Sequence, residues 1–457
     1  AIELAAARVR TLSPAALRDR MTKRLPLLTG GPRDAPARQR TLRDTIGWSH
    51  EQLDEELRLL FARLSVFDGH TYLEAIESVI GGEGLLDRLA DLCDASFLMR
   101  VDPENELFGM LETLREFARE QLELDPQHRQ WRETHARYFL VFASIASEGL
   151  KAAGQRDWLE RLRVSDSNLR AALDTFIEWQ QGPEALRLAT ALRPYWQRVG
   201  ALSNGRKRLH QALALAHDAA PQLRAPALLG EGVLAWRQGD LGAARPLLQE
   251  SLELGRASGD NLTTINALRS LGALAQNRAD YSAARELLTS SLELAKELND
   301  VESEANTYLS LGNVALDQGL HAEADAHYTR SLELSEAISD TLGYAYALDN
   351  LGVSAWHRGD LERASRLADD VMELYQQLNI ESGKANVWHR RCLVALELGR
   401  LEEAEEHGLR ALRVRTAQGE DRGGAFVLYD LARVALARRQ TEVARTRLRQ
   451  GLRLALP

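Results

Sequence analysis

The sequence is poor in the residues that mark several classes of protein. Of its 457 residues only two are cysteines, Cys93 and Cys392, and aromatic residues make up 6%. Two cysteines so far apart provide neither a disulfide framework nor the ligand spacing of a zinc site, and a reducing compartment is their natural setting. No uninterrupted apolar stretch reaches the ~18 residues of a membrane-spanning helix, and the first residues lack a signal-peptide pattern. We therefore expect a cytoplasmic location and no contact with a membrane.

The sequence also lacks the short motifs of common catalytic sites. It contains no phosphate-binding Gly-x-x-x-x-Gly-Lys-Ser/Thr loop, and neither the zinc-protease motif nor the nucleophile-elbow motif. The Gly30-Gly31 pair is not followed by Lys-Ser and is typical of a linker. His321 and His327 are six positions apart, which does not place both on one helical face. We expect no catalytic residue, no metal and no cofactor in this segment.

Alanine, leucine, arginine and glutamate are abundant, which favours long helices over sheets. A chain of 457 residues is too long for one ordinary core, so we expect several domains or an extended array. The formal net charge of −9 gives no reason to expect a general nucleic-acid-binding surface.

A small residue recurs every 40 positions in the second half of the chain. The series is Gly232, Gly272, Gly312, Gly352, Cys392 and Ala432. An alanine follows each member twelve positions later, and a large apolar or aromatic residue precedes each by four positions. Two antiparallel helices pack closely only where small side chains meet the partner, while large neighbours fill the space beside the crossing. Each cycle is therefore predicted to be a helical hairpin.

This pattern resembles the tetratricopeptide repeat over six units, about residues 221–457, although its period exceeds the usual 34 residues by about a helical turn. Turns such as Gly239-Asp240 separate the two helices of a unit. A less regular seventh unit, from Trp196 to His217, precedes them. The resemblance implies a right-handed α-solenoid whose concave groove is lined by the first helix of each pair.

The residues expected to line this groove lie six and three positions before, and one and four positions after, the small residues. Asparagine amides can pair with the backbone of an extended peptide, and tryptophans offer flat apolar contact area. The alternative for each residue is that it is solvated or packs between repeats. For the groove as a whole the pattern favours a peptide, protein or small-molecule ligand. The candidate residues are Trp236, Asn266, Arg269, Gln276, Asn306, Asn313, Tyr346, Asp349, Trp356, Asn386 and His389.

Residues 36–125 are predicted to form a winged helix with a small β-hairpin. An amphipathic helix around 55–64 is followed by helices at about 71–79 and 84–96, and alternating residues at 97–101 and 106–109 flank a turn. The last of these helices carries Asp87, Asp91 and Asp94 against a single Arg88. Contacts to DNA phosphates need Lys and Arg, so we expect a hinge or scaffold and no direct nucleic-acid binding.

Three runs extend the resemblance along the chain: Arg40 to Ser49, Leu60 to Phe67, and Asp166 to Leu173. They are similar to parts of STAND-class signalling NTPases, bacterial transcriptional regulators with an NB-ARC-type ATPase ahead of tetratricopeptide repeats. The resemblance implies that the chain is the C-terminal part of such a protein. Its regions would be the end of the NB-ARC-type helical region (1–35), the winged helix (36–125), a helical linker domain (126–180) and the superhelix (181–457).

One nucleotide contact of this family is not transferred to the chain. Related proteins have a Met-His-Asp motif at the end of the winged helix, whose His contacts bound ADP. Here Met110 is followed by Leu111, which cannot donate a hydrogen bond to a phosphate. The resemblance therefore places ATP or ADP only in an upstream domain. Aromatic residues of the linker domain, such as Trp131 and Phe139, are predicted to be core.

The resemblance implies a sensor. An inducer docks in the groove and releases contacts with the upstream ATPase in cis, which permits nucleotide exchange and oligomerisation. Such switching requires that the ligand binds two states with different affinities. The output implied is transcriptional, although cyclase and kinase outputs occur in the family. The alternative is a constitutive scaffold whose repeats join other proteins.

Overall fold

The computed structural model describes residues 41–455 except 151–154, 379 and 419. The predicted NB-ARC-type region, residues 1–35, lies outside the described residues. The chain divides into unit 1, which is Ala1–Ala146 with Leu159–Gln180, and unit 2, which is Ser147–Trp158 with Gln181–Pro457. The described residues form 22 helices and one small sheet. The predicted, mainly α-helical fold class is therefore confirmed.

Unit 1 begins with helices and strands in the order of a winged helix. Its three strands form one antiparallel sheet in the order β1-β3-β2, which includes the predicted hairpin of β2 and β3. The Asp54 carboxylate caps the second helix by accepting a hydrogen bond from the Leu57 amide. The elements are α3 (Leu42–Glu51), α4 (Glu55–Leu64), β1 (His70–Tyr72), α5 (Leu73–Val79), α6 (Leu85–Asp94), β2 (Met99–Asp102), β3 (Leu107–Gly109) and α7 (Glu112–Leu122).

The prediction of a helix at 71–79 is wrong for its first two residues, which belong to β1. Thr71 pairs with Phe108 of β3, and Tyr72 pairs with Leu107. A strand of three residues is too short for alternation to reveal it. Its partner lies much later in the sequence, so pairing within the sheet decides a conformation that the local pattern does not.

Three more helices complete unit 1 and lead into unit 2: α8 (His128–Gly149), α9 (Gln155–Val164) and α10 (Asp166–Glu178). Phe139 and Phe142 of α8 are buried, as predicted for aromatic residues in this stretch, whereas Trp131 is half-buried.

Asn168 joins α10 to β1 and the residues just before it within unit 1. Its Oδ1 accepts a hydrogen bond from the Asp68 amide at 2.7 Å, and its Nδ2 donates to the His70 carbonyl at 3.0 Å. His135 Nε2 lies 3.1 Å from the same Oδ1. Burial lowers the pKa of His135 to about 4, so the imidazole is neutral and its Nε2 can donate to Asn168. One fully buried amide thus links the sheet, α8 and α10.

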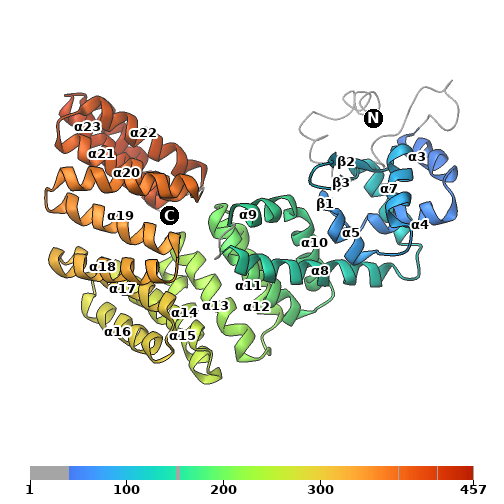
Figure 1. Ribbon diagram of the computed structural model, residues 1–457, viewed down its shortest axis with the longest axis horizontal. Coiled ribbons are helices and arrows are strands. Elements are labelled where there is room, and N and C mark those ends of the chain that lie inside the picture. Colours follow the sequence, from blue (N-terminus) through green and yellow to red (C-terminus); the bar gives the residue numbers. More distant parts are fainter. Residues whose placement is uncertain (1–40, 151–154, 379, 419, 456–457) are drawn as a thin grey trace. The chain divides into compact units, whose positions relative to one another are not determined.

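Unit 2 is a stack of helical hairpins, and Figure 1 shows its successive antiparallel pairs. Each helix from α11 onward contacts the next one along the chain. Helices α13 to α24 are the six predicted repeats, and α11 and α12 are the irregular unit before them. The bounds are α11 Gly182–Arg198, α12 Leu202–Leu215, α13 Pro221–Arg237, α14 Leu241–Ser258, α15 Asn261–Asn277, α16 Tyr281–Glu297, α17 Val301–Asp317, α18 His321–Ala337, α19 Thr341–His357, α20 Leu361–Gln377, α21 Glu381–Glu397, α22 Leu401–Ala417, α23 Asp421–Ala437 and α24 Thr441–Ala455.

Aspartates at 20-residue intervals start many of these helices. Each accepts a hydrogen bond from a backbone amide of the first helical turn, which satisfies a group that the helix leaves unpaired. The residue before Asp240 and Asp360 is a glycine with a φ of +84° or +77°, a conformation that favours glycine. The capping aspartates are Asp240, Asp260, Asp280, Asp300, Asp340 and Asp360.

The small residue of a repeat lies where the two helices of the hairpin cross. A Cβ added to Gly232 would lie 2.8 Å from Leu248 Cγ, and one added to Gly312 would lie 2.5 Å from the Tyr328 ring. Contacts this short leave no room for a side chain. The predicted role of the small residue in close helix packing is therefore confirmed at these crossings.

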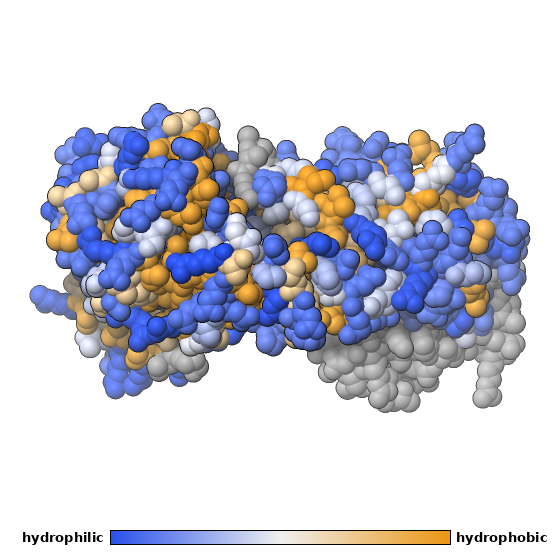
Figure 2. Space-filling model, turned by 90° about the horizontal axis from the view of Figure 1, so that it is seen from below, coloured by the Kyte–Doolittle hydropathy of each residue, from blue (hydrophilic) through white to orange (hydrophobic). Residues whose placement is uncertain are grey.

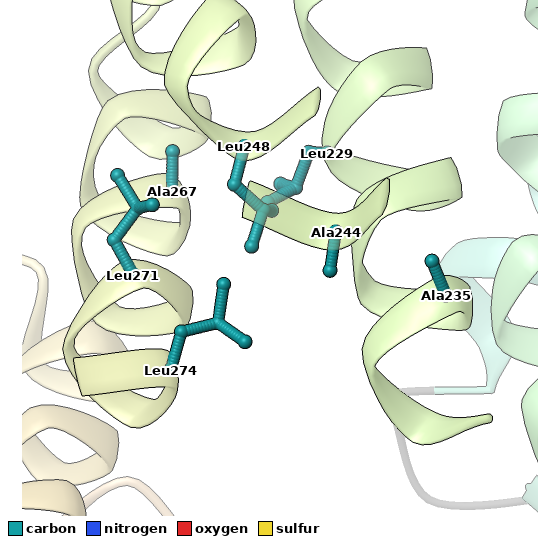
Figure 3. Packing of buried hydrophobic residues seen from close by; sticks show 7 residues of the cluster. All are labelled: Leu229, Ala235, Ala244, Leu248, Ala267, Leu271 and Leu274. Carbon is teal, nitrogen blue, oxygen red and sulfur yellow. The ribbon is translucent and has the colours of Figure 1, made fainter. Parts of the chain in front are cut away.

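The core of the array continues from one repeat into the next. Leu229 of α13, Leu248 of α14, and Leu271 and Leu274 of α15 belong to one buried cluster, drawn in Figure 3. Because buried clusters such as this one draw residues from two hairpins, a single repeat cannot bury its apolar face alone.

Hydrophilic side chains cover much of the face shown in Figure 2, and apolar side chains reach that surface in separate groups. Across the described residues, no helix combines the length and apolar character needed to cross a membrane. The same residues contain no cluster of three or more His, Cys, Asp or Glu side chains that could hold a metal ion.

We expect Asn168→Ala to lower the local stability of unit 1 by about 1–3 kcal/mol, because it leaves buried polar partners without hydrogen bonds. Hydrogen exchange of peptides covering β1 and α10, measured by mass spectrometry, reports this opening. Arg170→Ala on the same helix is the control, since the Arg170 side chain is largely exposed. Unchanged exchange in the Asn168 variant would contradict its linking role.

Candidate ligand-binding face

The first helices of the hairpins form a continuous face of unit 2, called the inner face below. Each of α13, α15, α17, α19 and α21 contacts the next first helix in the series. Among the described residues, no comparably close contact joins successive second helices. The inner face is therefore concave, because the helices that line it lie closer together than those behind it.

The two ends of the inner face meet. At the turn between α11 and α12, a Cβ added to Gly200 would lie 2.6 Å from the Gln418 carbonyl oxygen, after α22. Arg237 at the end of α13 lies 3.8 Å from Glu420, which precedes α23. Figure 1 shows the orange and red helices of this unit turning back towards the green ones. The two ends of the array are thus in contact.

All eleven predicted groove residues lie on first helices of this array. Asp349 is buried, and the other ten are half-buried. The concave arrangement brings these residues onto one face, as the sequence predicts, while their binding of a ligand stays a prediction.

Four of the eleven residues bond to a polar side chain on the adjacent first helix, and these bonds join neighbouring repeats. Asn386 differs, because its Oδ1 accepts a hydrogen bond from Arg415 of α22 at 2.7 Å. The sequence alternative of packing between repeats therefore describes part of this set. The four pairs are Gln276–Asp317, Asn313–Asn350, Asp349–Arg390 and His389–Asp430.

Other candidates form fewer hydrogen bonds with neighbouring helices. Asn266 Nδ2 donates to the Leu262 carbonyl of its own helix at 2.9 Å, which leaves its Oδ1 available. The side chains of Asn306 and Arg269 make no hydrogen bond or ion pair within the described part of the chain. Burial raises the pKa of Tyr346, so its hydroxyl stays protonated at neutral pH and can donate.

Arg390 is an inner-face residue that the sequence analysis misses. Its side chain is only 4% exposed and pairs with Asp349 of the preceding repeat. It occupies space beside Gly352, where a Cβ would lie 2.6 Å from Arg390 Nη1. The register explains this placement, because Ala368 stands where Leu248, Leu288 and Tyr328 fill the three preceding crossings. A small residue at position 368 together with an arginine 22 positions later is the signal that could reveal the pair.

Burial changes the pKa of Arg390 in this pair. Removal from water lowers the pKa of Arg390 to about 9, so the guanidinium remains charged at neutral pH. Its Nε and Nη1 have no hydrogen-bond partner in the described residues. Within the described chain Arg390 forms its ion pair with Asp349, and this pair belongs to the joint between two repeats.

Three arginines near the start of the array lie outside the predicted register. Arg193 and Arg198 belong to α11, and Arg237 stands at the end of α13. Arg198 Nη2 donates to the Leu150 carbonyl at 2.8 Å, and Arg237 is paired with Glu420. Both Arg198 and Arg237 act electrostatically to lower the pKa of Tyr346, although its burial raises this pKa more strongly.

The candidates among residues 36–125 belong to unit 1. Leu111, at the position of the family's nucleotide-contacting His, is 52% exposed just before α7. On α6 the side chains of Asp87, Asp91 and Asp94 are exposed, whereas Arg88 is half-buried and pairs with Glu56. The exposed charge of α6 is therefore acidic, which opposes contact with phosphates.

Residues 223–297, 303–377 and 383–456 match the sequence family described as the tetratricopeptide repeat. The array from α13 to α24 belongs to the tetratricopeptide repeat (TPR) family. This match covers the predicted repeats, so their resemblance to the family is confirmed.

Relatives of the TPR chain are found among bacterial proteins. One from Mycobacterium tuberculosis, provisionally named an HTH-type transcriptional regulator, is 34% identical over 284 residues, which are 59% of this chain and 32% of the relative. A second M. tuberculosis protein, which is uncharacterised, is 34% identical over 129 residues, or 27% of this chain and 33% of its own. The chain spans about a third of the length of the curated relatives it matches.

Solved structures share this architecture at low sequence identity. A Rap protein complexed with competence and sporulation factor has a TM-score of 0.53, covers 88% of this chain and 98% of its own, and is 13% identical. It shows that the fold is shared. A STAND protein with a tetratricopeptide repeat sensor, from Pyrococcus horikoshii, covers 98% of this chain and 71% of its own at 14% identity and a TM-score of 0.43.

Asp349→Ala leaves Arg390 buried without a counter-charge, so we expect the free energy of unfolding to fall by about 3–5 kcal/mol. The double substitution Asp349→Leu/Arg390→Leu removes both charges and should cost much less, since apolar residues can replace a buried pair. Urea unfolding followed by circular dichroism measures both. Arg366→Ala, which removes an exposed pair with Glu362, is the control. Equal losses in the single and double variants would contradict a structural role for Asp349.

Proposed function

We propose that this chain is the sensor part of a STAND-type signal-transduction ATPase. The TPR array binds a peptide, protein or small-molecule inducer on its inner face, and binding controls an upstream NB-ARC-type ATPase with a transcriptional output. The inner face carries this proposal, because polar and aromatic side chains from successive first helices lie on it. A concave, mostly preformed surface with a few polar groups is the usual form of a ligand site.

The contact between the two ends of the array supports a switching role. A ligand on the inner face that contacts helices from both ends would bind arrangements with and without this contact with different affinities. That difference is what a ligand needs to shift an equilibrium between two states. The similarity to a protein provisionally named an HTH-type transcriptional regulator supports the transcriptional output.

The alternative is a constitutive scaffold for other proteins. Phe426, Tyr429 and Leu436 on α23 are 57%, 56% and 52% exposed. Large exposed apolar side chains on neighbouring turns of a helix favour a protein contact at this end of the array. In this alternative the partner covers α23 and no ligand occupies the inner face.

Affinity-selection mass spectrometry of the whole chain distinguishes these functions. The probes are a library of random hexapeptides and the small-molecule fraction of a bacterial extract, and each retained species is recorded by mass. Asn266→Ala/Asn306→Ala should lose at least about tenfold of the retention, because each lost hydrogen bond inside a binding site is worth about 1 kcal/mol.

The control is Glu293→Ala, an exposed position on the second helix α16, which should retain the same species as the native chain. Retention that is equal in all three proteins, or no retention by any of them, contradicts a ligand site on the inner face. Loss of a partner protein on substitution of Phe426 alone would favour the scaffold.

A further inference from the structure

The last hairpin of the array, α23 and α24, has an outward face that no further hairpin covers among the described residues. Leu436 at the end of α23, and Leu448 and Leu452 of α24, are 52%, 39% and 60% exposed. Arg445 and Arg449 of α24 are also exposed, and each lies three residues before one of the α24 leucines, which makes them neighbours on the helix surface. These five residues are called the end face below.

In earlier repeats the next hairpin covers the positions of the α24 leucines. Leu248, at the position of Leu448, is buried in a cluster with Leu271 of α15. Leu412, at the position of Leu452, packs against a buried cluster that includes residues of α23. The leucines of the end face are therefore of the kind that a following helix buries elsewhere in the array, and an exposed group of such residues marks an interaction surface.

The positions of the two arginines also face the next hairpin in earlier repeats. In three repeats the residue at the position of Arg445 forms an ion pair with the following hairpin, and in one repeat the residue at the position of Arg449 does so. Charges at these positions therefore select the side chains of whatever packs on them. The pairs are Arg285–Glu323, Asp325–Arg358 and Glu405–Arg438 at the first position, and Asp369–Arg391 at the second.

The arginines of the end face have no such partner in a following hairpin. Arg445 lies 4.0 Å from Glu442 of its own helix, and both side chains are largely exposed. Arg449 forms no ion pair with another residue in the part of the chain that the structure describes. The end face thus combines apolar surface with positive charge, and its complement is an apolar surface bordered by carboxylates.

We propose that the end face binds an amphipathic helix of another protein, whose apolar stripe is flanked by acidic residues. This helix takes the place that the first helix of the next hairpin has in earlier repeats, so its apolar side chains cover Leu448 and Leu452. Its carboxylates meet Arg445 and Arg449, and guanidinium groups suit planar carboxylates. The inference goes beyond the proposed function, because four of these five residues belong to α24, whereas first helices form the inner face.

The test measures the binding of two fluorescent synthetic peptides to the full chain by anisotropy. Each peptide is an amphipathic helix of about 18 residues, long enough to be partly helical alone, with leucines along one face. Glutamates flank the leucines in one peptide, and lysines flank them in the other. We expect the glutamate peptide to bind at least about tenfold more tightly. This preference should shrink as salt is added, because ions screen the attraction.

The variant Arg445→Glu/Arg449→Glu should bind the lysine peptide more tightly than the glutamate peptide, because the charge of the end face changes sign. Leu452→Ser should weaken the binding of both peptides by about tenfold, since apolar contact area is lost. Arg366→Glu/Arg413→Glu, at exposed positions on α20 and α22, makes the same change in net charge and should keep the native preference. Thermal melting followed by circular dichroism verifies that each variant is folded.

Each other outcome counts against the proposal in a distinct way. Equal binding of the two peptides by the native chain overturns the acidic character of the partner, and binding of neither peptide overturns the site. A preference that survives the reversal of charge at Arg445 and Arg449 places the bound peptide elsewhere on the chain. Self-association of the native chain in sedimentation velocity, abolished by Leu452→Ser, would assign the end face to a second copy and overturn the partner helix.

Discussion

Two helices approach closely only where one of them presents almost no side chain, and the whole array depends on this constraint. At Gly312 the partner ring of Tyr328 occupies the place that a Cβ would take. The same contact recurs with Leu248 over Gly232, and it fixes how far apart the two helices of a hairpin lie. With this distance set, each hairpin exposes an apolar face that only the next hairpin can cover. The curved stack and its inner face follow.

The inner face has two tasks that compete for the same positions. Side chains such as Gln276 and Asn313 join one repeat to the next, and a side chain used in this way has fewer groups for a ligand. Within the described chain Asn266 donates to a carbonyl of its own helix, so its Oδ1 remains for another partner. The repeat that contains Ala368 shows the opposite case, because Arg390 fills the space beside Gly352 and couples two repeats through Asp349.

The sequence predicts the repeats well because the same small, large and turn positions recur in six units. It predicts the inner face for the same reason, since the register places every candidate on a first helix. What it misses depends on contacts between distant positions. β1 forms only because Thr71 meets Phe108, and the Asp349–Arg390 pair needs residues of two hairpins.

The most direct test of the close-approach constraint is the effect of Gly312→Ala on the free energy of unfolding in urea. In an unconstrained helix, alanine in place of glycine stabilises by about 1 kcal/mol. Here the added methyl group meets the Tyr328 ring, so the account predicts destabilisation by about 1–3 kcal/mol. Gly242→Ala, where the nearest atom lies 3.8 Å away on Asp240, should show the ordinary stabilisation. An increase in stability for Gly312→Ala would contradict the account.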